Sequence, residues 1–524
     1  MTVNTVRSLL EYAAERWPDK TALRHGDATL SYAELLDEVD QVAVYLNGLN
    51  LPEGSRIGIY SQKSLDQVVA ILAILSTPHI LVPITRLLKP EQIRHIIDDC
   101  SIACLFTDEN KIANVKAIDY TGPIVSYTAT DEADVSFAEI RKVCRGPLEC
   151  NVRSHANAVI TYSFGSTGNP KGVVIDHRAL TDGARIVSRY LGIRHEDVLS
   201  GILSFNLDYG LNQIFSTLYR GATLALHRFA LSADFFDHLI DDEVTVLPLM
   251  PIHITRMFDT DPHRIPHPGY LSRIRVISSS GGNVTPLMIK NVTTHFPDAD
   301  FYSMHGLTEA FRSAYLDPRQ IHIRPRSIGK AIPDVELYII NDEGEACQPR
   351  EVGELIHRGA CIYRGYWNAP EETAKRFKSI QILEKVIHPE GQLIDEIVVA
   401  SGDYVYADEE GYIYFVSRKD DMIKTRGYRV SPHEIESVVF EHLQSITECA
   451  VFSIPDEEIE EEIVMVYNAK EPIPRNEILF ELKQHLPNYM LPSQILYRQN
   501  MPLKSLHDRQ IDKEALRKEF LNAL

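Results

Sequence analysis

The chain has 524 residues, which is more than a single hydrophobic core usually holds, so we expect two or more domains. Hydrophobic residues make up 44% of it and charged residues 24%, which are ordinary proportions for a globular protein and exclude a fibrous or disordered chain. A formal net charge of −20 disfavours nucleic acid and anionic lipid as partners, because their phosphates would be repelled.

The first residues, MTVNTVRSLLEYAAERW, lack the apolar core and the small-residue cleavage site of a signal peptide. The longest apolar run, residues 68–75, is far shorter than the ~20 residues that span a bilayer. Seven cysteines without a CxxC pair fit neither a disulfide framework nor a zinc site. We therefore expect a cytoplasmic protein with reduced cysteines and no membrane partner.

In chain order, apolar periodicity predicts an alternation of helices and short strands. Helices are expected over residues 5–16, 31–46, 64–75, 176–190 and 286–295. Strands are expected over residues 56–60, 79–82, 158–162 and 274–278. This alternation is typical of α/β layers built on parallel strands.

From Gly353 the pattern changes to short β-rich pieces, with a hairpin turn expected at residues 408–411. Beyond residues 418–421 the pattern is α+β: helices over residues 432–442 and 475–485, and strands over 448–453 and 462–467. The predicted fold is α/β, with a large N-terminal domain (1–417) of layered α/β subdomains plus a β-rich subdomain, and a small α+β C-terminal domain (422–524).

The segment YSFGSTGNPKG, residues 162–172, follows a predicted strand and precedes a predicted helix. Small residues let backbone N–H groups approach an anion, hydroxyls add donors, and Lys171 adds positive charge. Because Gly172 follows Lys171, the segment is not a Walker loop. Residue chemistry alone leaves two interpretations, a phosphate-binding loop and a flexible turn.

This segment resembles the signature loop of the AMP-forming adenylating superfamily, which includes acyl-CoA synthetases, peptide-synthetase adenylation domains and luciferases. The resemblance continues in order through TLSYAEL (29–35), SSSGGN (278–283), HGLTE (305–309), GEL (353–355) with RGYWN (364–368), SGD (401–403) and KDDMIKTRGYR (419–429). It implies ATP and Mg²⁺ as cofactors and a C-terminal domain that rotates about residues 418–421, pivoting at Asp420.

The resemblance also assigns site residues. Those expected to bind ATP are Ser163, Gly165, Ser166, Thr167, Gly168, Lys171, Gly281, Gly282, Asn283, His305, Gly306, Thr308, Asp403 and Arg418. Glu309 is expected to hold Mg²⁺, since a hard cation prefers carboxylate oxygen, and Asp403 to accept hydrogen bonds from the ribose. The alternatives are a turn residue for Asp403 and a helix N-terminal charge for Glu309.

The implied reaction has two halves. A carboxylate first attacks the α-phosphate of ATP, and a thiol then takes the acyl group from the adenylate. Gly427 is expected to leave room for the pantetheine arm of coenzyme A or of an acyl-carrier protein.

The sequence departs from the family pattern at one position. In the family a C-terminal lysine bridges the carboxylate and the α-phosphate, and LHDRQIDKEAL, residues 506–516, places Gln510 there. Arg509, Lys504 or Lys513 are alternative cations.

The segment LSFNLDYGLNQ, residues 203–213, resembles the block in which amino-acid-activating members carry an aspartate that pairs with the substrate ammonium. Asp208 stands at that position, which favours an amino acid over other carboxylic acids, with a structural aspartate as the alternative. Met250 and Ser279 are expected to line the pocket.

Three rival functions remain open. Gln510 motivates the first, a transferase that uses an adenylate or another activated acyl donor with weak or no adenylation of its own. The second is a luciferase-like oxidoreductase, and the third is a nucleotide-binding regulator without turnover. The nearly intact ATP and Mg²⁺ motifs speak against the third.

Overall fold

The computed structural model describes residues 3–86, 88, 90–144, 148, 150–163, 170–229, 232–258, 262–387, 395–425, 428–456, 459–503 and 511–523. The chain divides into two compact units. The first comprises Met1–Leu337, His357–Gln381 and Gly391–Val399, and the second Tyr338–Ile356, Ile382–Glu390 and Ala400–Leu524. Each unit is described by itself.

The first unit contains a sheet whose strand order is β7-β6-β5-β3-β4-β8-β9. Its strands are β3 (Arg56–Tyr60), β4 (Ile80–Pro83), β5 (Cys104–Thr107), β6 (Ile124–Ser126), β7 (Val135–Ser136), β8 (Asn157–Ser163) and β9 (Lys171–Asp176). They alternate with helices α2 (Tyr32–Gly48), α3 (Leu65–Ile74), α4 (Pro90–Cys100), α5 (Glu109–Lys116) and α6 (Phe137–Val143). All recorded pairs are parallel except β8 with β9.

A second set of neighbouring strands in the first unit follows the order β16-β15-β14-β13-β12-β10-β11-β1-β2. Its strands are β1 (Thr21–His25), β2 (Ala28–Ser31), β10 (Val198–Ser200), β11 (Thr223–Ala225), β12 (Val246–Leu249), β13 (Val276–Ser279), β14 (Asp300–His305), β15 (Ala314–Leu316) and β16 (Ser327–Ala331). Strands β10 to β14 pair in parallel, and β14, β15 and β16 continue antiparallel.

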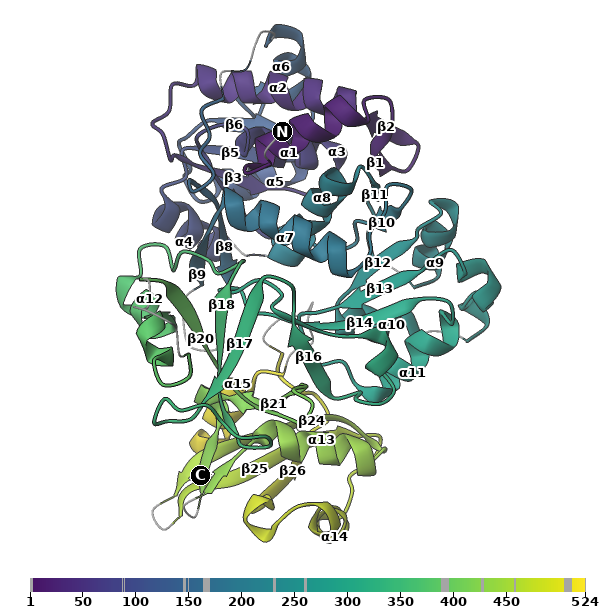
Figure 1. Cartoon of the computed structure of the whole chain (residues 1–524), viewed down its shortest axis with the longest axis vertical. Helices are drawn as coiled ribbons and strands as arrows, with labels where there is room; N and C mark the ends of the chain where they lie inside the picture. Colours follow the sequence, from purple (N-terminus) through teal and green to yellow (C-terminus); the bar gives the residue numbers. More distant parts are fainter. Residues whose placement is uncertain are drawn as a thin grey trace. The chain divides into compact units, whose positions relative to one another are not determined.

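The helices of this part of the unit are α1 (Val6–Arg16), α7 (His177–Tyr190), α8 (Asp208–Arg220), α9 (Ser232–Asp241), α10 (Pro251–Phe258), α11 (Pro286–His295) and α12 (Pro370–Arg376). Helices α7 and α8 pack against each other, and α10 packs against α11 beside β12–β14 (Figure 1). Leu180 and Val187 of α7 and Leu211 and Phe215 of α8 are buried in one apolar core. Burial of these aliphatic and aromatic side chains stabilises the helix pair that carries Asp208.

The second unit contains a sheet of order β23-β22-β25-β24, with β26 beside β25. Its elements are β21 (Ile413–Arg418), β22 (Ile423–Thr425), β23 (Tyr428–Val430), β24 (Ile446–Asp456), β25 (Glu460–Ala469), β26 (Gln494–Tyr497), α13 (Pro432–His442), α14 (Arg475–His485) and α15 (Lys513–Ala523). Strands β17 (Val335–Ile340), β18 (Gly353–Gly359) and β20 (Ile397–Ala407) run from one unit into the other, and β19 (Phe377–Ser379) pairs with β20.

The α/β fold class predicted from the sequence is confirmed, and many predicted elements occur within a residue or two of their expected ends. Helices α1 and α2 begin at capping boxes formed by Thr5 and Ser31, which satisfy free N–H groups of the first turn. The hairpin at residues 408–411 is present between β20 and β21. Among the described residues, the structure has no helix that is long and apolar enough to cross a membrane.

The expectation that residues 162–172 lead from a strand into a helix was wrong. Strand β9 follows the loop and pairs antiparallel with β8, in a register that places Ser163 opposite Lys171. Helix α7 begins only after β9, at His177, with Asp176 as its N-cap. Strands β8 and β9 therefore form an antiparallel pair, and the helix follows β9 instead of following Gly172 directly. A hinge at residues 418–421 stays a prediction.

Candidate active site

Several predicted site residues follow the carboxyl ends of neighbouring parallel strands. The pairings of Leu249 with Ser279 and of Ser279 with Ser303 show that β12, β13 and β14 end side by side. The residues at or after these ends are Met250, Ser279, Gly281, Gly282, Asn283, His305, Gly306, Thr308 and Glu309. Asp208 opens the helix that follows the adjoining strand β10. Ligands of open α/β sheets bind at this edge.

Two positions at this edge favour glycine, one because of its positive φ angle and the other because there is no room for a Cβ atom. Gly281 has a φ of +83°, and a Cβ atom there would lie 3.2 Å from Cε of Met250. A Cβ atom on Gly306 would lie 2.6 Å from Cα of Arg312, which is too close for any side chain. The chain between Gly306 and Arg312 therefore folds back tightly on itself, and this turn presents Thr308 and Glu309.

Lys171 lies at the start of β9 and is engaged by an acidic side chain that sequence reasoning missed. Its Nζ donates a hydrogen bond of 2.6 Å to Oε2 of Glu372, near the start of α12. Lys171 and Lys375 hold the pKa of Glu372 down to about 2. The Lys171 ammonium also lies 5.7 Å from the ring centroid of Tyr366. The cation predicted to contact phosphate is thus partly neutralised by the protein itself.

Tyr366 connects Lys171 to Glu309, because its hydroxyl donates a hydrogen bond to Oε1 of Glu309. Burial and the neighbouring Glu309 carboxylate raise the pKa of Tyr366 well above its usual value, so the phenol stays protonated and donates. The backbone fixes this arrangement: Tyr366 bridges Val173, and the N–H of Tyr363 donates to the carbonyl of Glu309 at 3.1 Å. The structure therefore brings Lys171 and Glu309 together through Tyr366.

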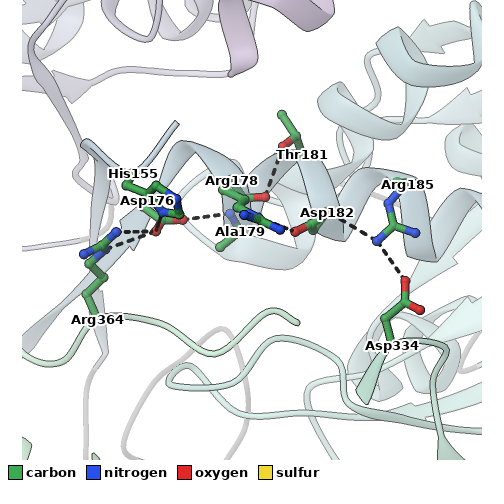
Figure 2. A network of polar contacts seen from close by, with 9 residues as sticks. All are labelled: His155, Asp176, Arg178, Ala179, Thr181, Asp182, Arg185, Asp334 and Arg364. Atoms are coloured by element: carbon green, nitrogen blue, oxygen red, sulfur yellow. Dashed lines mark hydrogen bonds and ion pairs between the residues drawn. The ribbon is translucent and has the colours of Figure 1, made fainter. Parts of the chain in front are cut away.

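A polar network around Asp176 anchors the segment that carries Tyr366 (Figure 2). The Nε and Nη2 atoms of Arg364 donate to Oδ2 of Asp176 at 3.0 and 2.9 Å. Asp176 also caps α7 by accepting from the N–H of Ala179 at 2.8 Å. The two charge-assisted hydrogen bonds to this one carboxylate oxygen fix Arg364 against the start of α7. It thereby positions Tyr366, two residues further along the chain.

Asp208 lies at the first position of α8, beside a small cavity. The cavity is lined by Ala179, Leu180, Gly183, Asp208, Asn212, Phe215, Phe311 and Tyr363. Burial raises the pKa of Asp208 to about 6, and repulsion from Glu309 acts in the same direction. Arg312 and the Tyr209 N–H, which donates to Oδ1 of Asp208 at 2.6 Å, oppose the shift. A carboxylate whose charge is costly in this way favours a cationic ligand group.

Arg312 is a buried cation that sequence reasoning also missed. Its side chain is 3% exposed and lies over the rings of Phe311 and Tyr209, at 4.3 and 4.5 Å from their centroids. Nη2 donates to Oδ1 of Asn212 at 2.6 Å, and Nε and Nη1 have no hydrogen-bond partner among the described residues. The sequence does contain a signal for a buried cation: Arg312 stands three residues after Glu309, in the segment AFRSA (310–314), whose other residues are apolar or small.

The other predicted residues that the structure describes belong to the second unit, and Asp420 among them is described by its backbone alone. Asp403 of β20 is buried and opposite Arg418 of β21, whose Nη1 donates to Oδ1 of Asp403 at 2.5 Å. This pair joins two of the residues that are expected to bind ATP, and Asp403 is the one to which the ribose contact was assigned. Asp420 lies in a short 3-10 turn, Lys419–Asp421, and the neighbouring Lys419 donates to Glu354 at 2.8 Å.

Several predicted residues lie outside the described residues. They are Gly165, Ser166, Thr167 and Gly168 of the phosphate loop, Gly427 and Gln510. Ser163 is described by its backbone alone, as the last residue of β8.

For the ATP-dependent reaction that the sequence resemblance implies, changing Glu372 to glutamine is expected to lower the KM for ATP by up to about fivefold at low ionic strength. The change removes the anion that competes for Lys171, and a partly exposed ion pair is worth about 0.2–1 kcal/mol. Steady-state kinetics at two salt concentrations would measure the effect, which should shrink as salt screens the charges. Glu371→Gln, on the same helix, is the matched control and should leave KM unchanged. A higher KM in Glu372→Gln would contradict the prediction.

The pKa of Asp208 also predicts a pH dependence of stability. Its pKa is about 6 in the folded chain against an ordinary value of 3.8, so the folded chain binds more protons between these pH values. Stability is therefore lost as the pH rises through this window. Asp208→Asn should raise the free energy of unfolding by about 1–2 kcal/mol at pH 7.5. Urea unfolding should show this gain shrinking as the pH falls towards 5; a gain independent of pH would contradict the assignment.

Comparison with known proteins adds three findings. The model of a family described as AMP-binding enzyme matches residues 10–367. The chain is 27% identical to tyrocidine synthase 1 of Brevibacillus parabrevis, over 99% of this chain and 45% of that protein. It is 27% identical to delta-poly-L-ornithine synthetase of Acinetobacter baumannii (strain AB307-0294), over 98% of this chain and 37% of that protein. The chain thus spans less than half the length of these two curated relatives.

Solved structures show the same fold over the whole chain. ATP-bound MatB from Rhodopseudomonas palustris superposes with a TM-score of 0.86 at 21% identity, covering 99% of both chains. An anthranilate CoA ligase, AuaEII, in complex with anthranoyl-AMP gives a TM-score of 0.83 at 23% identity, covering 99% of this chain and 98% of that one.

Proposed function

Because the chain belongs to the family of AMP-binding enzymes, we propose that it is an AMP-forming ligase that activates a carboxylic acid as an acyl-adenylate. It then passes the acyl group to the phosphopantetheine thiol of coenzyme A or of an acyl-carrier protein. The observation that carries the proposal is that Tyr366 contacts both Lys171, at the start of β9, and Glu309, which follows the carboxyl end of the parallel strand β14. A cation and an oriented carboxylate held close to each other support the binding of a nucleotide and its metal ion here.

In the first step, an oxygen of the acid attacks the α-phosphorus of ATP, and the bond from that phosphorus to the bridging oxygen breaks. Pyrophosphate leaves with the electron pair, and the acyl-adenylate remains. Positioning and charge stabilisation govern such a transfer. In this proposal Lys171 exchanges its contact with Glu372 for phosphate oxygens, and Thr308 adds a hydroxyl donor.

Glu309 fits the ligand chemistry of Mg²⁺. Tyr366 donates to its Oε1, and within the described part of the chain Oε2 accepts no hydrogen bond from a protein group. A carboxylate oxygen together with substrate phosphates is the usual environment of this hard cation. When bound, Mg²⁺ would supply charge neutralisation for the phosphates, while Tyr366 keeps the Glu309 carboxylate in one orientation.

In the second step, a thiol sulfur attacks the acyl carbon, a thioester forms, and AMP leaves from the bond between the acyl carbon and the phosphate oxygen. We assign ribose binding to Asp403, held by Arg418. Adenine binding is assigned to Gly281, Gly282, Asn283, His305 and Gly306. Rotation about Asp420 and a pantetheine path past Gly427 complete the proposal.

An amino acid is the proposed substrate class. The Asp208 carboxylate beside the cavity supports it, because a substrate ammonium would compensate its burial. A relative named delta-poly-L-ornithine synthetase also supports an amino acid, and a structural neighbour named as a CoA ligase supports coenzyme A as one acceptor. Met250 and Ser279 would form further walls of the pocket.

Acid-dependent exchange of labelled pyrophosphate into ATP tests the proposal. A panel of amino acids and their des-amino analogues should reveal exchange with at least one acid, and Glu309→Gln should lower it by at least about 10²-fold. His322→Ala, an exposed histidine, serves as the control and should leave the rate unchanged. Absence of exchange with every acid, together with thioester formation from a supplied adenylate, would favour the transferase alternative that Gln510 motivates.

A further inference from the structure

The second unit contains a cluster of metal-ligating side chains to which no role has been assigned above. His442 ends α13, and Glu481 and His485 lie one turn apart near the end of α14. One ligand atom from each of these side chains lies within 4.8 Å of the other two. The imidazole rings of His442 and His485 are stacked, with centroids 3.6 Å apart and planes 9° apart. Nε2 of His485 is 3.5 Å from Oε1 of Glu481.

The packing of the two helices fixes the separation of these residues. Ile435 and Val439 of α13 and Ile478 and Leu482 of α14 are buried in one apolar core. The spacing of Glu481 and His485, four residues apart, places both on one face of α14. The side chains of His442, Glu481 and His485 are 29%, 31% and 33% exposed, so an ion from solvent can reach them.

The electrostatics of the cluster favour a cation. Both histidines are the last residues of their helices, so the negative ends of two helix dipoles meet there. Glu441 adds a second carboxylate, with Oε2 at 3.9 Å from Nε2 of His442. The amide of Gln484 donates to Oε2 of Glu481 at 3.4 Å and orients that carboxylate.

Two imidazoles and a carboxylate form a ligand set for Zn²⁺ and similar transition ions, not for Mg²⁺, which prefers oxygen ligands alone. Ligand atoms around a tetrahedral Zn²⁺ lie about 3.3 Å apart, given metal–ligand distances of about 2.0–2.1 Å. The ligand atoms already lie within 4.8 Å of one another, so side-chain rotations at these partly exposed residues would have to close only the remaining difference. We propose that His442, Glu481 and His485 bind a divalent transition ion of the Zn²⁺ class, which ties α13 to α14.

Titration of the EDTA-treated full chain with Zn²⁺, followed by calorimetry, tests the site. The wild type should bind one equivalent of Zn²⁺. His442→Ala and His485→Ala should each raise the Kd for this Zn²⁺ at least tenfold. His322→Ala removes an exposed histidine elsewhere and should bind like the wild type. Zn²⁺ should also raise the thermal unfolding temperature of the wild type and of His322→Ala, but not that of the two cluster variants. Mg²⁺ at the same concentration should neither bind to the cluster nor raise the unfolding temperature through it.

The cysteines are the competing source of Zn²⁺ ligands, since Cys144, Cys150 and Cys347 are partly exposed. The absorption spectrum with Co²⁺ in place of Zn²⁺ distinguishes a cysteine site from the histidine and glutamate site. Thiolate ligands give an intense near-ultraviolet charge-transfer band, and imidazole and carboxylate ligands do not. Such a band, or Zn²⁺ affinity unchanged in both histidine variants, would overturn the proposal. His442→Gln and His485→Gln, which keep polar side chains of similar size, should weaken binding in the same way with an unchanged circular dichroism spectrum. The result does not depend on whether the chain adenylates an acid.

Discussion

Replacing Gln510 by lysine is expected to raise the rate of acid-dependent ATP–pyrophosphate exchange by about 10²–10³-fold. The family to which the sequence shows resemblance carries a lysine there, which bridges the attacking carboxylate and the α-phosphate. A preorganised donor that acts in the transition state is worth about 3–4 kcal/mol. The neutral amide of glutamine lacks the charge that this contact requires, so restoring the charge should accelerate adenylation.

Thioester formation from a preformed adenylate is the internal control for Gln510→Lys. This second step should change little, because the bridging contact belongs to the first. Gln510→Met, which has a similar length and no charge, should leave exchange at or below the wild-type rate. Equal acceleration of both steps would contradict the assigned role.

An unchanged exchange rate in Gln510→Lys would mean that another cation already makes the contact. Lys513 is the first residue of α15, and its Nζ forms a 2.6 Å ion pair with Oε1 of Glu436. Lys504 and Arg509 are then the candidates to change to alanine. A large loss of exchange in one of them would identify the cation.

The extent to which the fold could be predicted depended on local signals. Helix α1 and helix α2 carry both an apolar period and a capping box, and the apolar period alone predicted starts at Thr5 and Ser31, the residues that prove to be the N-caps. Strand β9 was missed because KGVVID, residues 171–176, is a short apolar run between a polar loop and a helix. Its identity as a strand comes from pairing with β8, which a single-sequence pattern does not reveal.

The candidate site shows the same division between local and long-range information. Lys171, Glu309 and Asp208 were named from motifs that are continuous in the sequence. Their contacts were not predicted, although Tyr366 lies within the RGYWN motif, because Glu372 is 201 residues from Lys171 and Tyr366 is 57 residues from Glu309. Arg312 shows a further limit: an arginine is ordinarily exposed, and only the packing of Phe311 and Tyr209 around it reveals a buried cation.

Changing Asp208 to asparagine is expected to lower kcat/KM for an amino-acid substrate by about 10²–10³-fold. The variant keeps the size of the side chain and removes the charge that would pair with the substrate ammonium. Removing one partner of a buried charge pair costs about 2–5 kcal/mol, because the other charge stays unpaired. The des-amino analogue makes no such pair, so its kcat/KM should fall much less or rise.

The ratio of kcat/KM for the amino acid to that for its des-amino analogue separates this role from a structural one. A structural aspartate would affect both substrates equally, and an unchanged ratio in Asp208→Asn would contradict amine recognition. The pH profile gives a second measure. Because the pKa of Asp208 is raised to about 6, the wild-type KM for the amino acid should rise as the pH falls below 6 and the carboxylate is protonated. Asp208→Asn has no such group, and its KM should stay flat over the same range.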